Sequence, residues 1–434
     1  MRILFCCEFY APSVGGVPEV MRQLAERLAE KGHEVTVATS QLASRDFSNL
    51  NGVRIQEFKV SGNLVKGIFG DQDDYREYII REDFEVVMIK AAQQWTFDAL
   101  WPVLDQINVP KVFIPCGFSG LLEPDYADYF AKIPEVLGKF DHLIFYASDY
   151  RDINFAKQHG LSKFSIIPNG ASERDFSVVP DTAFRARNDI SADDFVFLTV
   201  GSFTGLKGHL ELARAFEQMQ IPDSKSAVLI LNGNESSRTV VNYLTSPGEL
   251  VNLLRTYGAY YTVRHLAKSF LFSTGIVDKS KVVKQIAATI NSRGKNKKVL
   301  ITNFPKAELI QAYLAADLFV FASNVEYSPL VLFESAAAGT PFLSVDVGNA
   351  VEIAQWTESG IICSSERDVR GYTRVDPSVL AEQMNRMMSD DTGLRELGAR
   401  GHRNWQERFT WKKIAEQYEK IFTDLLQNNE KSRY

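Results

Sequence analysis

The stretch RILFCCEFYAPSVGGVPEVMRQLAERLAEKGHEVTVAT, residues 2–39, carries the pattern that decides the fold. Arg2–Cys7 is a short apolar run, and Glu8–Gly16 is a loop that contains proline and glycine. Val17–Lys31 has apolar residues at helical spacing and is followed by a glycine that ends the helix. Glu34–Thr39 then has the pattern of a second strand. A strand, a loop, a helix and a strand in this order predict a parallel β-α-β unit.

The same order of elements continues through the first part of the chain and starts again further on. Further strands are expected at Val53–Phe58, Val86–Lys90, Lys111–Pro115, Leu143–Tyr146 and Phe164–Ile167. A second series is expected at Phe195–Val200, Ala227–Leu231, Val299–Thr302, Leu318–Ala322, Pro341–Ser344 and Ile361–Cys363. Strands that alternate with helices favour parallel sheets covered on both faces. The sequence therefore predicts an α/β protein with two tandem, doubly wound, Rossmann-like domains.

The domain boundary is expected near Asp175–Asp181, where polar residues and proline interrupt the pattern. We therefore predict a first domain over 1–178 and a second over 179–410, with a C-terminal amphipathic helix in 411–434 that packs back onto the first domain. An insert over 234–298 interrupts the second domain, with helices expected at Glu249–Tyr257 and Lys281–Ile290. The second half of the insert is basic, which suits a solvated face or contact with anionic lipid or a polyanionic acceptor.

Composition limits the classes of function. The chain has 434 residues and a formal net charge of −6, which argues against a nucleic-acid-binding protein. Its four cysteines have no metal-ligand spacing, and no apolar run is long enough to cross a membrane. A cytoplasmic protein, at most peripheral at the membrane, is expected. Asp71-Gln-Asp73-Asp74 contains an Asp-x-Asp pattern but has no flanking strand, so no metal site is predicted.

The strongest chemical pattern is ASNVEYSPLVLFESAAAG, residues 322–339. A buried strand leads into a polar loop, and a helix is expected to begin with Ser328 as N-cap and Pro329 at its first position. The N–H groups and the dipole of such a helix start favour an anion such as a diphosphate. Glu334 lies in an apolar helix and needs hydrogen-bond donors, which ribose hydroxyls would supply. Glu326 lies at the mouth of the loop, where it can meet a sugar.

Structural explanations remain open for both glutamates. Glu334 can pair with an arginine or with backbone amides, and Glu326 can be an ordinary surface residue. A second chemical pattern is Val200-Gly-Ser-Phe-Thr-Gly-Leu-Lys207-Gly208, in which glycine permits close approach of a ligand and Lys207 supplies charge for a phosphate. A third is Gly15-Gly16 at the first strand-to-helix turn, for which a plain tight turn is the alternative.

Taken in order, these segments resemble the large retaining family of group-1 (family 4) glycosyltransferases with the GT-B fold, in which two Rossmann-like domains face each other across a cleft. The resemblance spans nearly the whole chain. It rests on Gly15-Gly16, Ile166-Ile-Pro-Asn-Gly170, Gly201 with Lys207-Gly208, Ala312-Tyr-Leu-Ala-Ala-Asp317, Glu326 with Glu334, Val347-Gly-Asn-Ala-Val-Glu352 and Phe409-Thr-Trp411.

The resemblance implies a role for each matching residue. Lys207 and Glu326 would be the catalytic pair, with Lys207 on the diphosphate and Glu326 near the reacting carbon of the sugar. Glu334 would bind the ribose, and Gly16 would allow the first domain to close over the donor. The remaining donor contacts would come from Gly201, Ser202, Asn303, Phe304, Ser328, Pro329 and Leu330, of which Asn303 and Phe304 would flank the base.

Two positions depart from the family pattern, and the acceptor side is less clearly marked. The family usually has arginine where this chain has Ser202, so a basic residue from the insert is a candidate replacement. The family often has histidine where this chain has Cys116-Gly117, which removes a common contact to the donor sugar. Acceptor pockets in this fold come from loops of the first domain, and we assign Glu8, Cys116, Gly117 and Ser119 to that side.

The expected function is transfer of a hexosyl or N-acetylhexosaminyl group, with retention, from a nucleotide-diphosphate sugar to a hydroxyl of a glycan, lipid-linked saccharide or protein. A UDP-sugar is favoured over a GDP-sugar, and no tightly bound cofactor is expected. The main alternative is a catalytically impaired donor-binding or scaffold subunit of a glycosylation complex. A sugar-nucleotide epimerase is disfavoured by the few histidines near the motifs. A dinucleotide oxidoreductase is disfavoured by the missing glycine fingerprint.

Overall fold

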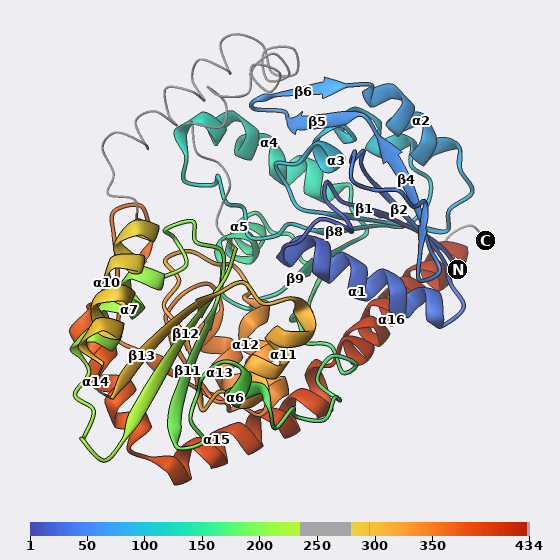
Figure 1. Cartoon of the computed structure of the whole chain (residues 1–434). Coiled ribbons are helices and arrows are strands. Elements are labelled where there is room, and N and C mark those ends of the chain that lie inside the picture. The colour runs from blue at the N-terminus through green and yellow to red at the C-terminus, as the bar shows by residue number, and fades with distance from the viewer. Residues whose placement is uncertain (235–278, 295, 432–434) are drawn as a thin grey trace. The chain divides into compact units, whose positions relative to one another are not determined.

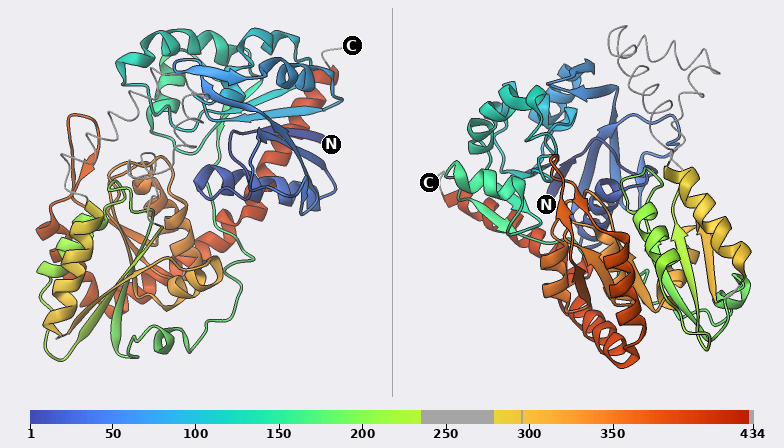
Figure 2. Two further views of the ribbon diagram at one scale, coloured as in Figure 1. Left: turned by 45° about the horizontal axis from the view of Figure 1, so that its top comes forward. Right: turned by 90° about the vertical axis from the view of Figure 1, so that its left-hand side faces the viewer.

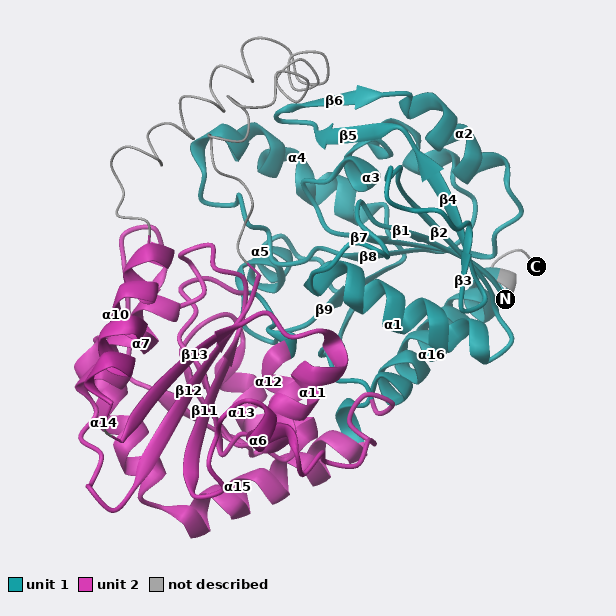
Figure 3. Ribbon diagram, viewed as in Figure 1, with its two compact units in different colours: residues 1–172, 327–330, 408–434 teal, residues 173–326, 331–407 magenta. Residues whose placement is uncertain are grey.

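The computed structural model describes residues 1–234, 279–294 and 296–431. The chain divides into two compact units, shown in different colours in Figure 3. Unit 1 comprises residues 1–172, 327–330 and 408–434, and unit 2 comprises residues 173–326 and 331–407. Each unit is built around its own sheet.

The described part of unit 1 contains an eight-stranded sheet in the order β10-β9-β8-β7-β1-β2-β4-β3. The strands are parallel except for β3, and β1 pairs with both β2 and β7. They span Arg2–Cys6 (β1), Glu34–Ser40 (β2), Asn49–Leu50 (β3), Val53–Phe58 (β4), Val86–Lys90 (β7), Lys111–Ile114 (β8), His142–Phe145 (β9) and Phe164–Ile166 (β10). A separate hairpin joins β5 (Val60–Asn63) to β6 (Gly67–Gly70).

Helices cover both faces of this sheet (Figure 1). The helices are α1 (Gly16–Glu30), α2 (Gln72–Arg81), α3 (Trp95–Asp98), α4 (Ala127–Gly138), α5 (Arg151–Gln158) and α16 (Trp411–Lys431). Side chains alternate along β1, so that Ile3 and Phe5 pack with α1 and α16, whereas Leu4 and Cys6 face the opposite core. Figure 2 shows α1 and α16 side by side, and the buried residues Trp411, Tyr418 and Phe422 belong to their shared core.

The described part of unit 2 contains a six-stranded parallel sheet in the order β13-β12-β11-β14-β15-β16. Its strands span Asp194–Val200 (β11), Ser226–Asn232 (β12), Lys297–Thr302 (β13), Leu318–Phe321 (β14), Phe342–Val345 (β15) and Gly360–Cys363 (β16). A short hairpin joins β17 (Glu366–Arg367) to β18 (Thr373–Arg374). All of the central strand β14 and the middle of β11 are buried, as expected for a parallel sheet covered on both faces.

The helices of unit 2 also form two layers (Figure 2). One layer contains α7 (His209–Gln218), α10 (Lys279–Arg293) and α14 (Pro377–Met388), in which α7 packs against both of the others. The remaining helices are α6 (Phe184–Arg187), α11 (Lys306–Ala315), α12 (Leu330–Ala338), α13 (Ala350–Thr357) and α15 (Asp391–Asn404). The helix expected at Glu249–Tyr257 lies outside the described residues, whereas the one expected at Lys281–Ile290 falls within α10.

The division into units differs from a simple split of the chain. The N-terminal segment of unit 1 ends at Ser172, a few residues before the expected boundary. Tyr327–Leu330, which lies inside the polar loop and helix start of the second half, belongs to unit 1. Tyr327 packs on Tyr146 and Tyr150 with ring centroids 5.5 and 4.7 Å away, and its hydroxyl accepts a hydrogen bond from the Tyr146 N–H at 3.0 Å. A four-residue piece of the candidate donor loop is therefore anchored in the core of unit 1.

Candidate functional site

The candidate site in unit 2 lies where the order of the strands reverses. The chain runs outward from β11 through β12 to β13 and then returns to β14 on the other side of β11. Open α/β sheets bind ligands beyond the carboxyl ends of the strands at such a switch point. The loop 201–208 follows β11, and the loop 322–329 follows β14. The two chemical patterns of the sequence therefore emerge from neighbouring strands at this point.

An ion pair joins these two loops. The Lys207 ammonium lies 2.5 Å from the carboxylate of Glu326, and the Ser323 hydroxyl donates to the same carboxylate oxygen at 3.0 Å. The Glu326 side chain is 15% exposed and the Lys207 side chain 31% exposed, so the pair is reachable from solvent. The structure thus brings together the two residues that the sequence assigns to catalysis. The role of Ser323 was not foreseen, because a serine in a polar loop gives no distinctive signal.

Gly208 allows the loop 201–208 to lie close to the start of the loop 322–329. Gly208 precedes α7 with a φ of 75°, and a Cβ at this position would lie 2.0 Å from the Ala322 carbonyl oxygen. No larger side chain fits without moving the backbone. His209 is buried beneath the loop and stacks on Phe203, with ring centroids 4.3 Å apart. Burial and the nearby Lys207 lower the pKa of His209 to about 4, so its ring is neutral at physiological pH.

Glu334 is held by a tyrosine that the sequence analysis missed. Glu334 lies half-buried on α12, and the Tyr313 hydroxyl from α11 donates to its Oε2 at 3.0 Å. Tyr313 is fully buried, and burial together with Glu334 raises the pKa of its phenol far above the usual value. The sequence left an arginine or backbone amides open as partners of Glu334, and Tyr313 is a partner that it did not suggest. Spacing alone gives no sign that this hydroxyl reaches the next helix.

The start of α12 differs in detail from the expectation. The helix begins at Leu330, and within the described part of the chain the buried Ser328 hydroxyl has no hydrogen-bond partner. The prediction that Ser328 caps the helix is therefore wrong. The Ser328 carbonyl instead accepts a hydrogen bond from the Asn169 amide at 3.1 Å. Ser328, Pro329 and Leu330 all belong to unit 1, so their proposed backbone contacts to phosphate remain a prediction.

The residues expected near the base follow the edge strand β13. Asn303 is exposed, and the Phe304 N–H donates to Asn232 Oδ1 at 2.8 Å, which ties this turn to the end of β12. Their contact with a base remains a prediction.

The structure also shows a lysine of the insert on the glycine loop. Lys279 Nζ donates to the Gly205 carbonyl at 3.0 Å and lies 3.5 Å from Glu211. An insert lysine therefore reaches the loop in which Gly201 precedes Ser202 rather than arginine. That the Lys279 charge replaces the arginine that the family usually has at the position of Ser202 stays a prediction.

Unit 1 has its own switch point, between β1 and β7. Glu8 follows β1 and is half-buried, and Asp98 of α3 is buried. Burial and Asp98 raise the pKa of Glu8 to about 7. Gly16 is the first residue of α1, and a Cβ there would meet no atom within 4 Å. Gly16 is therefore exposed and can be approached closely, as its predicted role requires.

The other acceptor-side candidates lie in the loop after β8. Cys116 has a φ of 64°, and burial raises the pKa of its thiol, so it is not a reactive thiolate. The Gly117 N–H donates to Asp152 Oδ2 at 2.8 Å. The Ser119 hydroxyl donates to Gln93 Oε1 at 3.2 Å and is exposed. These residues line one edge of unit 1, and their contact with an acceptor remains a prediction.

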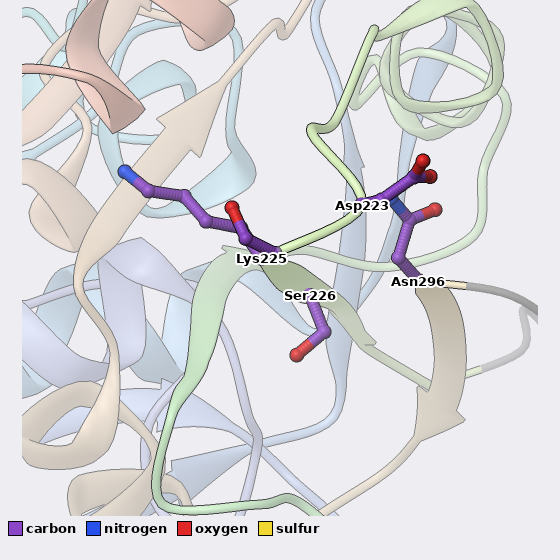
Figure 4. A pocket seen from close by; sticks show the side chains of 5 residues that line it. Asp223, Lys225, Ser226 and Asn296 are labelled. Atoms are coloured by element: carbon purple, nitrogen blue, oxygen red, sulfur yellow. The ribbon is translucent and has the colours of Figure 1, made fainter.

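A polar hollow in unit 2 lies at the edge of the sheet opposite to Lys207 and Glu326. Asp223, Lys225, Ser226 and Asn296 line it at the amino ends of β12 and β13 (Figure 4). Ligands of parallel sheets bind at the opposite, carboxyl edge. Within the residues that the structure describes, no group of three metal-binding side chains occurs, and no helix is long and apolar enough to cross a membrane.

Comparisons with known proteins agree with this geometry. The family described as "Glycosyltransferase Family 4" matches residues 14–173, and the family described as "Glycosyl transferases group 1" matches residues 273–404. A D-inositol 3-phosphate glycosyltransferase of Nocardia farcinica is 32% identical, with 93% of this chain and 83% of the relative covered. The N-acetyl-alpha-D-glucosaminyl L-malate synthase of Bacillus anthracis is 22% identical, with 97% of each chain covered.

Solved structures share the fold over nearly the whole chain. Sucrose-phosphate synthase from Thermosynechococcus elongatus superposes with a TM-score of 0.69 at 19% identity, covering 98% of this chain and 99% of that chain. Anabaena HepE in complex with UDP-glucose superposes with a TM-score of 0.62 at 15% identity, covering 98% of this chain and 100% of that chain. These neighbours have the GT-B fold, with two Rossmann-like domains. With its two matching family descriptions and its Nocardia relative, the chain belongs to the group-1 glycosyltransferases.

Proposed function

We propose that the protein transfers a hexosyl or N-acetylhexosaminyl group from a nucleotide-diphosphate sugar to an acceptor hydroxyl with retention of the anomeric configuration. The observation that carries this proposal is the Lys207–Glu326 pair at the switch point of unit 2. A reachable cation beside a carboxylate, next to a glycine loop and a helix start, suits a substrate with both a diphosphate and a sugar.

In this mechanism Lys207 acts on the leaving group. Negative charge grows on the diphosphate as the bond to the sugar carbon breaks, and the Lys207 ammonium stabilises that charge. Glu326 holds Lys207 in place before the donor binds and then faces the sugar near its reacting carbon. Glu334, fixed by Tyr313, accepts hydrogen bonds from the ribose. The acceptor hydroxyl attacks from the face that the leaving group vacates and passes its proton to the departing phosphate oxygen.

We propose a UDP-sugar as the donor, with a GDP-sugar as the alternative. The support for UDP is that the structural neighbour HepE was solved with UDP, with UDP and glucose, and with UDP-glucose. Relatives are named for inositol 3-phosphate and malate, both of which carry hydroxyl groups. A small hydroxylated acceptor is therefore a further candidate beside glycans, lipid-linked saccharides and proteins.

The proposal is tested by turnover with UDP-, GDP- and ADP-sugars against an acceptor panel that includes inositol 3-phosphate and malate. We expect nucleotide release with one nucleotide class and an α-configured product from an α-configured donor. The Lys207→Met variant should lose at least tenfold in kcat. Lys225→Met serves as a matched control because Lys225 is exposed at the opposite edge of the sheet. Nucleotide binding without turnover across the panel would favour a scaffold subunit, and an inverted product would contradict retention.

A further inference from the structure

The contact between Tyr313 and Glu334 joins two helices of unit 2. Tyr313 lies on α11 and Glu334 on the second turn of α12, and the phenol donates to Glu334 Oε2 at 3.0 Å. A hydrogen bond to a charged carboxylate is stronger than one between neutral groups. It therefore restricts which rotamer Glu334 adopts and where its second oxygen points.

Tyr313 is itself held on several sides. Its ring packs against Phe319, with centroids 5.4 Å apart, and against Phe176 at 6.0 Å. The buried Thr340 hydroxyl donates to the Tyr313 carbonyl at 2.6 Å. A side chain fixed by packing and by its backbone can hold its partner within a narrow range of positions.

The phenol remains a hydrogen-bond donor throughout the physiological range. Burial and the neighbouring Glu334 carboxylate raise the pKa of Tyr313 far above 10, so the hydroxyl keeps its proton. Glu334 is half-buried, whereas the apolar residues beside it, Leu332, Phe333 and Ala336, are buried. A half-buried carboxylate that is oriented by a neutral donor suits recognition of ligand hydroxyls.

We propose that Tyr313 is a positioning residue that sets the selectivity of unit 2 for a ribose with both hydroxyls over a deoxyribose. This inference rests on the proposed function, because it requires that Glu334 contacts the ribose of the donor. Tyr313 acts through Glu334 and does not touch the donor itself. When the phenol is removed, the carboxylate loses one of the contacts that orient it and should distinguish the ribose hydroxyls less well.

The test measures the dissociation constants of UDP, 2′-deoxy-UDP and 3′-deoxy-UDP by titration calorimetry. Wild-type protein should prefer UDP over at least one deoxy analogue by about tenfold or more, the loss expected for an unmade hydrogen bond to a charged group. Tyr313→Phe should weaken the binding of UDP about three- to tenfold and leave the affinity for that deoxy analogue nearly unchanged. In a protein that already carries Glu334→Gln, adding Tyr313→Phe should change the affinity for UDP little further.

Thr340→Val provides the matched control. It removes the hydrogen bond to the Tyr313 backbone but leaves the phenol, so it should lower the melting temperature without changing the preference for UDP over the deoxy analogues. If Tyr313→Phe weakens the binding of UDP and of both deoxy analogues equally, its role is merely structural and the inference is overturned. Unchanged UDP affinity in Tyr313→Phe would also overturn it. Failure of wild-type protein to bind either UDP or GDP would instead contradict the proposed function.

Discussion

Replacing Lys90, at the end of β7, should change the free energy of unfolding by an amount that follows from the surroundings of its side chain. Its side chain is fully buried, and Nζ donates to the Tyr146 hydroxyl at 2.6 Å. Within the described part of the chain no carboxylate pairs with it. Its electrostatic neighbours are Cys7 and Cys116, whose thiols stay protonated because burial raises the pKa of each. An ammonium without a counter-charge in a dry core is costly.

The cost can be worked from the pKa. Burial lowers the pKa of Lys90 from 10.5 to about 8. The difference of about 2.5 pKa units corresponds to a penalty of about 3 kcal/mol on the charged form. Lys90→Met keeps the length of the side chain and removes the charge, but it loses one hydrogen bond worth about 1 kcal/mol. We expect Lys90→Met to be about 2 kcal/mol more stable than wild type at pH 7.

The sign of this effect should depend on pH. The folded state binds the Lys90 proton less tightly than the unfolded state, so wild type gains stability as pH rises from about 8 to about 10.5. Near pH 10.5 only the lost hydrogen bond remains, and Lys90→Met should be about 1 kcal/mol less stable than wild type. Urea unfolding followed by tryptophan fluorescence at pH 7, 8, 9 and 10.5 measures this difference.

A matched variant shows whether the effect belongs to the buried charge. Lys111 is half-buried on the neighbouring strand, and its Nζ donates to the Ile107 carbonyl at 3.0 Å and lies 3.8 Å from Asp141. Lys111→Met should therefore not stabilise the protein at pH 7. Destabilisation by Lys90→Met at pH 7, or an effect equal at pH 7 and 10.5, would refute the reasoning about Lys90.

Two further predictions concern the two switch points. Gly208→Ala should destabilise unit 2 by about 2 kcal/mol or more and weaken UDP binding, because the new Cβ meets the Ala322 carbonyl at a strained φ. Gly294→Ala is its control, because φ is 56° there and the new Cβ would lie 4.0 Å from the Ser292 carbonyl oxygen. Equal losses of melting temperature in both variants would contradict the steric argument. The free energy of unfolding of Glu8→Gln should rise by about 1 to 3 kcal/mol relative to wild type as pH rises from about 4.5 to about 7. Folding raises the pKa of Glu8, so wild type loses stability when this carboxyl loses its proton, and the variant does not. Urea unfolding at pH 4.5 and 8 checks this, and a difference that does not change with pH would count against it.

The strands were predictable because parallel sheets leave a strong apolar pattern. Val53–Phe58 and Val86–Lys90 were predicted with the observed bounds, and the other expected strands fall within one or two residues of those found. The short hairpins β5–β6 and β17–β18 were not predicted, since segments of two to four residues carry too little periodicity.

The candidate site could be predicted only in part. Lys207 and Glu326 were assigned from the family resemblance, and the structure shows that they follow the adjacent strands β11 and β14 at the switch point of the sheet. The hydrogen bond from Tyr313 to Glu334 was missed because a buried tyrosine on α11 looks like any other core residue in the sequence. The place of Tyr327–Leu330 in unit 1 was missed because ring packing on Tyr146 and Tyr150 is a long-range contact with no local signature.

We propose above all that unit 2 binds a nucleotide-diphosphate sugar through Lys207 and Glu334. Titration calorimetry of UDP-glucose and GDP-glucose against wild type, Lys207→Met, Glu334→Ala and Lys225→Met measures this binding. We predict that one nucleotide class binds wild type and Lys225→Met equally well, and that Lys207→Met and Glu334→Ala each lose at least tenfold in affinity. Binding that is unchanged in both site variants, or no binding of either nucleotide sugar to wild type, would contradict the claim.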